Sequence, residues 1–471
     1  MSEKDSDDHL YDAVPLSERR GGFTMGLLWL TMVTCFPNVL AGFQWFKEGM
    51  NIQQALNGVL ISCAIIMAYS IPACYLGAKT GLTYTVLSRS VFGSIGARLI
   101  SINVIWISVG WYALNAIFLA DGIRGLFNMN VPQVWFAALM AILMAFNNFF
   151  GFSGVANFAR FLAAPVLLIW VGVAFFKACG SCPTSVWTES ASITSGHALT
   201  IVSSFVIGIA CWGNEPDYWR FGKKHWACSI VPVLVSLIIG QVIFPVTGWM
   251  LARMTGVTDF AAATRLMNTY VFGGWSIVAA AVLAINYVAV NDAGLYASIN
   301  AAENLKNYPR KFWVGSLMLL AAAATVMLFG YKQNFEAVAA LSCIVLPCAT
   351  VIMVAEEFLV KRICGKSEDL SVVVDYDEVP SLRWAAVAAL FIGSIVATIN
   401  SGFLPGTEQY AWGVPSMHGW IISLIAYLLL RPLELKYSAN AICTGKQEVI
   451  SEPTEELVGA SAVNSSAESS R

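Results

Sequence analysis

Twelve stretches of the chain are apolar over about 20 residues each, and short polar segments separate them. A helix that rises about 1.5 Å per residue needs roughly 20 apolar residues to cross a hydrocarbon core of about 30 Å. Soluble domains do not repeat runs of that length, so we expect an all-α polytopic membrane protein with twelve transmembrane helices. The expected spans are 23–42, 53–77, 97–120, 132–151, 157–178, 198–214, 228–252, 271–294, 312–330, 336–359, 384–401 and 413–431.

Basic residues are distributed unevenly between the two sides of these spans. Of the 27 Lys and Arg residues, all but six fall on the side that carries both ends of the chain. The six on the other side are Lys47, Arg124, Lys177, Arg253, Arg265 and Lys332. Because cytoplasmic loops are richer in Lys and Arg, we expect a multi-pass protein of the cell membrane with both termini in the cytoplasm.

The polarity of the chain also predicts its organisation. Residues 1–22 lack the basic start and short apolar run of a signal peptide, which indicates a cytoplasmic N-terminal tail. Residues 437–471 are rich in Ser, Glu, Thr and Ala without an apolar period, which predicts a disordered cytoplasmic tail. Between the tails we expect a core of ten helices over 23–359, followed by helices 11 and 12 over 384–431.

Composition and motifs argue against several classes of function. The net charge is only −2 and no basic patch stands outside the loops, so nucleic acid is not an expected partner. Cys179 and Cys182 form one C-x-x-C without a second ligand pair, which indicates filler thiols or a local disulfide rather than a metal centre. H-E-x-x-H, G-x-S-x-G and Walker motifs do not occur, nor does a filter-like repeat. An enzyme, an ATP-driven pump and a channel are therefore all disfavoured, while the oligomeric state stays open.

Two of the spans are interrupted. The first has Pro37 and Asn38 near its middle, and the sixth leads into Glu215 and Pro216. Proline frees backbone carbonyls, which at membrane depth are tolerated only against protein or a polar cavity. A carboxylate within a span costs about 2.5 kcal/mol or more, so Glu215 is at a helix end, paired or functional. Interrupted segments five spans apart are typical of inverted-repeat transporters, although proline kinks that only shape packing are an alternative.

Polar side chains on the third span suggest a pocket. Ser108, Trp111 and Asn115 are three and four residues apart, so they share one helix face. A ring for stacking beside donors and acceptors suits a flat heteroaromatic solute. Lipid-facing or interhelical packing is the alternative for each residue taken alone.

The eighth span carries Asn286, Asn291 and Asp292 on an otherwise apolar helix. Such residues are not expected to face lipid, so they line a pathway, cap a helix end or bond a neighbouring span. Glu356 and Glu357 lie near basic residues at helical spacing, and we interpret them as a structural cluster at the surface.

Several motifs resemble those of cytosine permeases in the nucleobase:cation symporter-1 family. They are CYLGAKTGLTYTVLSRSVFGSIGARL after the second span, VGWY in the third, PDYWRFGKK after the sixth, NDAGLYAS in the eighth and FLPG before the last. The resemblance implies a LeuT-type core of 5+5 helices in inverted repeats, plus two extra helices. It also implies a symporter that imports a nucleobase or a related heterocycle of the cytosine or purine type by alternating access, with a co-transported cation and no other cofactor.

Carried over by position, the resemblance makes Trp111 the ring on which the substrate stacks. Ser108 falls where cytosine permeases have a substrate-binding glutamine, and Asn115 falls where the related hydantoin transporter has one. The family's second stacking aromatic aligns with Gly208, so Trp212, one turn further on, is the candidate replacement. The expected substrate-binding residues are Trp111, Ser108, Asn115, Gly208, Trp212 and Asn291.

The ion site implied by the resemblance is altered. Sodium-coupled members have two threonines after the asparagine that matches Asn286, whereas this chain has Ala289 and Val290, which lack side-chain oxygens. We therefore expect H+ rather than Na+, because a carboxyl group removed from water holds a proton more readily. The candidates for binding the coupling ion or proton are Asn38, Glu215, Asn286 and Asp292. The alternative is a sodium-coupled permease for a hydantoin, allantoin or hydroxymethylpyrimidine type of compound.

Overall fold

The computed structural model of the chain describes residues 8–438 and residue 442. Side chains are left undescribed at residues 260–261, 332–337 and 340–341. The α-helices are α1 (Gly22–Val33), α2 (Phe36–Lys47), α3 (Ile52–Thr80), α4 (Tyr84–Phe127), α5 (Gln133–Met144), α6 (Gly151–Phe158), α7 (Ala164–Ser181), α8 (Ser195–Ala210), α9 (Pro216–Trp219), α10 (Ala227–Leu237), α11 (Phe244–Thr255), α12 (Phe260–Phe272), α13 (Ser276–Leu305), α14 (Arg310–Leu328), α15 (Phe335–Ala355), α16 (Lys361–Cys364), α17 (Trp384–Asn400) and α18 (Pro415–Tyr437). Short 3-10 or π-helical turns are η1 (Leu16–Glu18), η2 (Phe146–Phe150), η3 (Ala159–Ala163), η4 (Thr184–Thr188), η5 (Ile238–Ile243), η6 (Phe329–Asn334), η7 (Glu356–Val360) and η8 (Glu408–Tyr410). The predicted disordered tail, residues 437–471, lies outside the described residues except at 437, 438 and 442.

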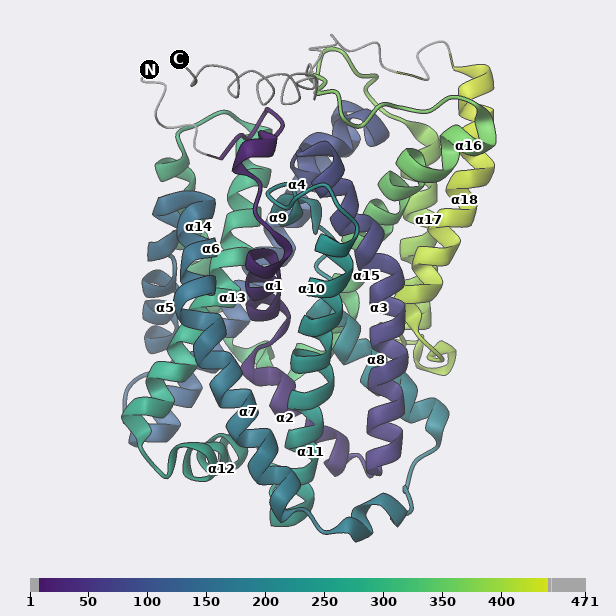
Figure 1. Cartoon of the computed structure of the whole chain (residues 1–471). Helices are drawn as coiled ribbons and strands as arrows, with labels where there is room; N and C mark the ends of the chain where they lie inside the picture. The colour runs from purple at the N-terminus through teal and green to yellow at the C-terminus, as the bar shows by residue number, and fades with distance from the viewer. Residues whose placement is uncertain (1–7, 439–441, 443–471) are drawn as a thin grey trace, which may run out of the picture.

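Long apolar helices dominate the described part of the chain and lie side by side, with η1 and the end of α18 on the same side of the bundle (Figure 1). Among the described residues, eight helical runs are long and apolar enough to cross a membrane, and the bent pair α1 and α2 makes a ninth. Two predicted spans fall on shorter helices, α8 and α17, and two others share the 49-residue run Gln133–Ser181. Gly151, with φ of +64°, interrupts that run. The all-helical class is confirmed, while the number of twelve crossings stays a prediction.

Both predicted interruptions are present. α1 and α2 meet at a bend of 48°, with Thr34 and Cys35 extended between them. Residues 211–215 separate α8 from α9. Pro37 stands in the first turn of α2 and Pro216 begins α9. A proline at the start of a helix removes an N–H group that has no partner in the helix, so both prolines start a second half-helix instead of kinking a continuous one.

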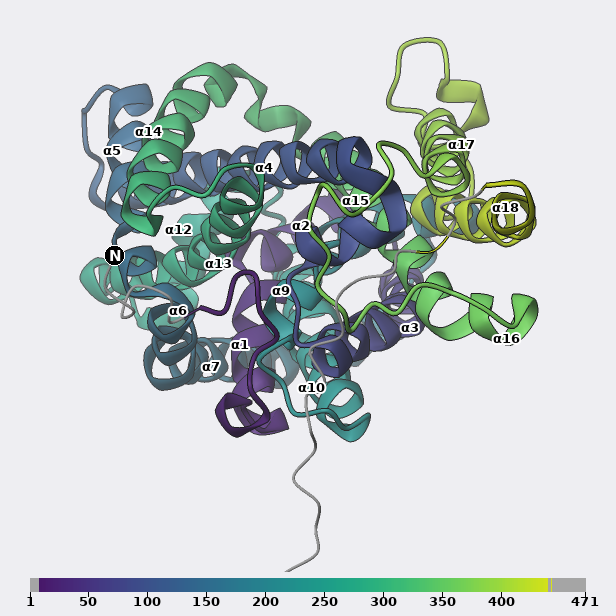
Figure 2. The same cartoon turned by 90° about the horizontal axis from the view of Figure 1, so that it is seen from above.

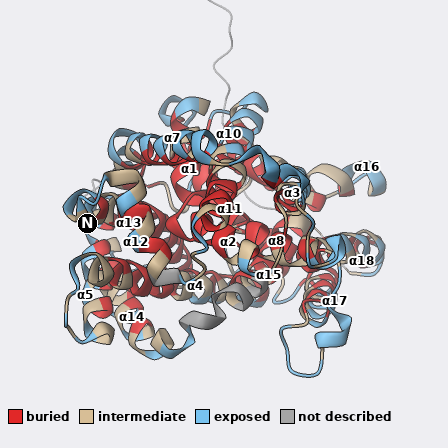
Figure 3. Cartoon of the chain, turned by 90° about the horizontal axis from the view of Figure 1, so that it is seen from below, coloured by how far each residue is buried: buried red, intermediate tan, exposed pale blue. Residues whose placement is uncertain are grey.

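α2 and α11 cross in direct backbone contact. A Cβ atom at Gly42 would lie 2.0 Å from the carbonyl oxygen of Pro245, and one at Gly248 would lie 1.8 Å from that of Val39. Small residues let membrane helices approach closely where lipid supplies no hydrophobic driving force. This contact fixes the second half of the first span, α2, at the buried centre of the bundle, with the exposed residues around the perimeter (Figure 3).

α17 and α18 pair with each other and lie at one side of the bundle, next to α15 (Figure 2). Glu356, which directly follows α15, accepts hydrogen bonds from Arg431 at 2.9 Å and Tyr427 at 2.7 Å, both in α18. Glu356 is fully buried, and Glu357 pairs with Lys79 of α3. The prediction of a surface cluster is wrong for Glu356 and Glu357, because each carboxylate binds a cation from another helix.

Residues 8–21 lie across the end of the bundle that carries the chain termini, and we call them the N-terminal strap. Asp8 forms an ion pair with Arg310, the first residue of α14, at 2.7 Å. Val14 donates its backbone N–H to the carbonyl oxygen of Gly81, which follows α3, at 3.0 Å. The strap therefore links two helices that are more than 200 residues apart in the sequence.

Candidate functional site

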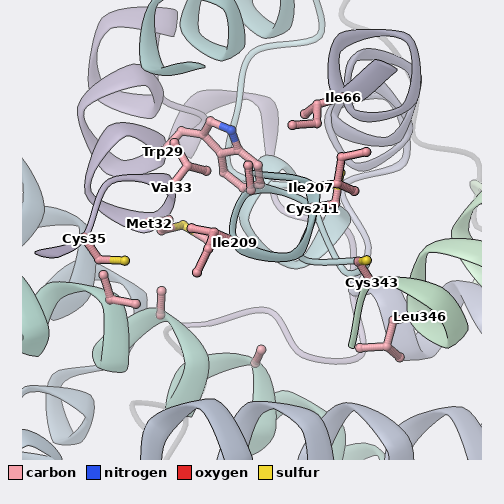
Figure 4. Packing of buried hydrophobic residues seen from close by; sticks show 14 of the residues in the cluster. Trp29, Met32, Val33, Cys35, Ile66, Ile207, Ile209, Cys211, Cys343 and Leu346 are labelled. Atoms are coloured by element: carbon pink, nitrogen blue, oxygen red, sulfur yellow. The ribbon is translucent and has the colours of Figure 1, made fainter. Parts of the chain in front are cut away.

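A cavity lies between the two interrupted spans. Its lining comes from α1, α4, α8, α13 and α15 and from both breaks. In Figure 4, Met32 of α1 lies beside Ile209 of α8, and both residues line the cavity. All six residues expected to bind substrate also line it, namely Ser108, Trp111, Asn115, Gly208, Trp212 and Asn291. Sequence positions up to 183 residues apart thus converge at one point, although their role in binding stays a prediction.

The cavity is uncharged and partly aromatic. None of the described residues that line it is Asp, Glu, Lys, Arg or His. The indole rings of Trp111 and Trp212 and the ring of Tyr112 contribute flat apolar surface. An ion moved into such a site would lose its hydration without gaining an opposite charge, whereas a neutral ring would lose much less. The lining therefore favours a neutral, planar solute.

Two carboxamides bond to each other across the cavity wall. Asn115 Nδ2 of α4 donates to Asn291 Oδ1 of α13 at 2.9 Å. Asn291 Nδ2 donates in turn to the carbonyl oxygen of Tyr112 at 3.2 Å. Within the described chain Asn115 Oδ1 accepts no hydrogen bond, and Asn115 lines the cavity. This arrangement fixes the direction of both amides and leaves an acceptor for an N–H group of a solute.

Asn286 binds the backbone of the first break. Its Oδ1 accepts the N–H of Phe36 at 3.0 Å, and its Nδ2 donates to the carbonyl oxygen of Thr34 at 3.0 Å. All three residues are buried. Asn286 thus supplies one partner each to a donor and an acceptor that the interruption leaves outside the helices.

Asn38 and Gln241 complete the bonding of this break. Both side chains donate to the carbonyl oxygen of Val33, at 3.2 Å from Asn38 and 2.6 Å from Gln241. Asn38 Nδ2 also donates to the carbonyl oxygen of Gly240 at 3.0 Å. Sequence reasoning missed Gln241, although a single glutamine within the apolar span 228–252 was an available signal. The carbonyl groups of residues 33 and 34 are thus occupied by amide donors.

Glu215 caps the second break. Its Oε1 accepts the backbone N–H groups of Trp212 at 3.2 Å and Gly213 at 3.3 Å, and its Oε2 accepts the hydroxyl of Tyr69 at 2.8 Å. Glu215 is fully buried, forms no ion pair within the described chain and does not line the cavity. Glu215 therefore supplies the acceptor for two backbone N–H groups that the second break leaves outside the helices.

Asp292 lies behind the cavity wall. It is fully buried, and its two oxygens accept from Asn147 Nδ2 at 2.7 Å and Asn148 Nδ2 at 3.1 Å. Both asparagines belong to η2, which lies at the end of the fourth predicted span, 132–151. No described cation pairs with Asp292, and Asn148 Oδ1 is buried without a hydrogen-bond partner in the described part of the chain. Asp292 is therefore a buried carboxyl group that accepts two amide hydrogen bonds, and one of those amides, Asn148, has an oxygen without a partner.

Gly208 is pressed against α15. A Cβ atom at Gly208 would lie 2.5 Å from the carbonyl oxygen of Ala339, so a larger side chain does not fit here without a shift of α15. Trp212 lines the cavity from within the second break, and its ring meets that of Tyr218 edge-on at a centroid distance of 5.9 Å. The position of Trp212 is compatible with the predicted replacement, and that role stays a prediction.

Two polar lining residues escaped the sequence analysis as site residues. Asn214 lies in the second break and donates to Asp217 Oδ2 at 3.0 Å. Ser342 reaches the cavity from α15. The cluster of polar residues at the second break could have indicated Asn214 as a site residue. A single serine in an apolar span, such as Ser342, does not distinguish a lining residue from a packing residue.

Comparison with known proteins gives concordant matches. The family described as permeases for cytosine/purines, uracil, thiamine and allantoin matches residues 13–416. A cytosine permease of Escherichia coli (strain K12) is 23% identical over 432 residues, covering 89% of this chain and 93% of that protein. The purine-cytosine permease FCY2 of Saccharomyces cerevisiae is 23% identical over 434 residues, covering 83% and 78%.

Solved structures share the fold. Mhp1, a nucleobase-cation-symport-1 family transporter in a closed conformation with bromovinylhydantoin bound, superposes with a TM-score of 0.68 at 16% identity, over 91% of this chain and 94% of that one. A Na+-coupled sialic acid symporter superposes with a TM-score of 0.63 at 12% identity, over 92% of both chains. The predicted LeuT-type fold class is confirmed by these likenesses.

Proposed function

The chain belongs to the nucleobase:cation symporter-1 family, and from this premise we propose that it imports a neutral nucleobase or a related small heterocycle by alternating access. The observation that carries the proposal is the uncharged cavity at the two breaks, where Trp111 and Trp212 offer aromatic surface beside the bonded pair of Asn115 and Asn291. An amide ring has both a face that stacks and N–H groups that a carboxamide oxygen accepts. Relatives named as cytosine and purine-cytosine permeases make these bases the first candidates.

A thermal-shift screen of nucleobases, hydantoins and hydroxymethylpyrimidines on the purified protein tests the substrate class. A ligand that binds only the folded state stabilises it by RT ln(1 + [L]/Kd), or about 2.7 kcal/mol at a hundredfold excess over Kd. We expect a neutral cyclic amide to raise the melting temperature and Trp111→Ala to abolish that rise. A hit that survives Trp111→Ala would contradict the assignment of this cavity.

Transport itself needs a separate measurement. In proteoliposomes a symporter accumulates the labelled hit above its external concentration when a cation gradient is applied, whereas a channel only equilibrates it. Uptake that stops at equal concentrations under every gradient would contradict secondary active transport.

The coupling cation that we propose is H+, carried by Asp292. The carbonyl groups of the first break already accept hydrogen bonds from Asn38, Gln241 and Asn286. Ala289 has no side-chain oxygen with which to bind a sodium ion. The neighbours of Asp292 suit both of its states, because the two amide N–H groups bind the carboxylate and the free Asn148 Oδ1 is an acceptor for a carboxylic acid. Two of the three partners of Glu215 are backbone N–H groups, which can only donate and therefore favour its ionised form.

Uptake of the substrate under separate proton and sodium gradients tests this coupling. We expect an inward proton gradient to drive accumulation at zero sodium, and we expect Asp292→Asn to retain exchange of labelled for unlabelled substrate but to lose proton-driven accumulation. Accumulation that follows the sodium gradient at constant pH would refute proton coupling. If Asp292→Asn keeps proton-driven accumulation, the carrier is another group.

A further inference from the structure

Arg20, at the end of the N-terminal strap, is held rigidly at the surface of the bundle. Its backbone N–H donates to the carbonyl oxygen of Phe221 at 2.6 Å, and its own carbonyl accepts the N–H of Lys223 at 3.0 Å. Its guanidinium lies 5.2 Å from the ring centroid of Phe152, which stacks on the ring of Phe221 at 3.7 Å. Backbone hydrogen bonds thus hold the main chain of Arg20, and the ring of Phe152 packs against its guanidinium.

The donors of this guanidinium are almost unused. A guanidinium carries five N–H groups, and the one side-chain bond of Arg20 runs to Ser153 Oγ at 3.5 Å. Arg20 forms no ion pair within the described part of the chain. Asp8, a strap residue whose carboxylate accepts the N–H of Phe152 in α6, is already paired with Arg310. Arg20 thus presents a half-buried positive charge without a counter-charge.

A second unpaired guanidinium lies nearby. Arg160 follows Ser153 by two helical turns, so it projects from the same side of the α6–η3 segment. Its described contact is with the ring of Phe161, 4.9 Å away, and no carboxylate pairs with it. Burial and the charge of Arg160 both lower the pKa of Arg20. Two guanidinium groups on one side of this segment, neither paired with a carboxylate in the described chain, favour an anion between them.

The surroundings of the pair are apolar and outward-facing. Phe23, Phe161 and Leu162 are 75%, 68% and 42% exposed. In Figure 2, α1 begins at the perimeter of the bundle, between α7 and α10. Exposed rings beside basic groups at the end of membrane helices suit a molecule that has acyl chains below an anionic head.

We propose that Arg20 and Arg160 bind the phosphate group of an anionic phospholipid in the leaflet next to the chain termini. Arginine binds phosphate oxygens through two parallel N–H bonds, and two arginines on one phosphate neutralise a head group that has no ammonium of its own, such as that of phosphatidylglycerol. The acyl chains lie along Phe23 and Phe161. The bound lipid holds the start of α1 against α6, and this role is independent of which solute the cavity takes.

Lipid titrations of the purified, delipidated full chain test the proposal, with thermal stability and native mass spectrometry as readouts. The probes are phosphatidylglycerol, phosphatidylcholine of the same acyl length, and inorganic phosphate. We expect phosphatidylglycerol alone to raise the melting temperature and to remain bound. Each arginine near the membrane surface contributes about a fivefold gain in affinity, so R20Q/R160Q binds phosphatidylglycerol roughly 25-fold more weakly.

The charge-matched control is K361Q/R362Q, which removes two exposed basic residues of α16 on the same side of the bundle. We expect it to bind phosphatidylglycerol like the unaltered protein. The single variant R160Q controls for misfolding, because Arg160 is exposed and forms no ion pair within the described chain, and we expect a fivefold loss of affinity. The proposal is overturned if R20Q/R160Q binds the lipid normally, if the control pair loses as much affinity, or if inorganic phosphate reproduces the whole stabilisation.

Discussion

Replacing Asn286 by alanine isolates the bonding of the first break. The carboxamide makes two hydrogen bonds of 3.0 Å, one to the N–H of Phe36 and one to the carbonyl of Thr34, and both groups are buried. Truncation leaves one donor and one acceptor unpaired, each at a cost of roughly 1–3 kcal/mol. We therefore expect Asn286→Ala to lower the free energy of unfolding by roughly 2–6 kcal/mol, the lower end applying where water enters the space left.

The same helix offers a matched control. Asn300 also lies in α13 and is fully buried, but neither its Oδ1 nor its Nδ2 has a hydrogen-bond partner among the described residues. Asn300→Ala removes the same atoms without breaking such a bond, so we expect a change near zero or a small gain in stability.

Unfolding in mixed micelles, followed by titration with a denaturing detergent, gives both free energies on one scale. Uptake in proteoliposomes then reports function, and we expect it to be lost in Asn286→Ala and kept in Asn300→Ala. Equal losses of stability in the two variants would refute the reasoning, because the effect would then belong to packing in α13 and not to the backbone of the break.

Further outcomes follow from other contacts. Arg431→Met leaves Glu356 and Glu434 buried without their cation, so we expect a loss of about 3–5 kcal/mol in the same titration; Glu356→Met with Arg431→Met should recover part of it. Gly208→Phe forces a ring against the α15 backbone, which we expect to lower the melting temperature and abolish uptake. Gly42→Ala should separate α2 from α11 and reduce the yield of folded protein in size-exclusion chromatography, and an unchanged profile would contradict the close crossing.

The predicted elements that held were those with a local cause. Pro37 and Pro216 mark the breaks because proline acts on its own backbone, and the structure has a helix start at each. The spacing of Ser108, Trp111 and Asn115 placed them on one face, and all three line the cavity. Helical periodicity and backbone chemistry are properties of a short segment, so a single sequence contains them.

The errors and omissions concern partners from distant helices. Glu356 looked like a surface residue because Lys361 is five positions away, yet its cation is Arg431, which the packing of α18 supplies. Gln241 and Asn148 were not singled out, because a lone amide gains meaning only from the group that it faces. No spacing rule relates residues that are separated by 75 or 208 positions, and only the fold determines such pairs.

The N-terminal strap sets a geometric limit on the motion of the transporter. Its Asp8 is anchored to α14 and its Val14 to the end of α3, and the chain between them can extend by at most about 3.6 Å per residue. While both anchors hold, the Cα atoms of Asp8 and Val14 cannot be more than about 22 Å apart, and this limits the gap between α3 and α14 at that end of the bundle. Residues 8–14, whose composition is that of a tail, therefore act as a tether between α14 and α3. The length of this tether limits how wide the molecule opens on this side.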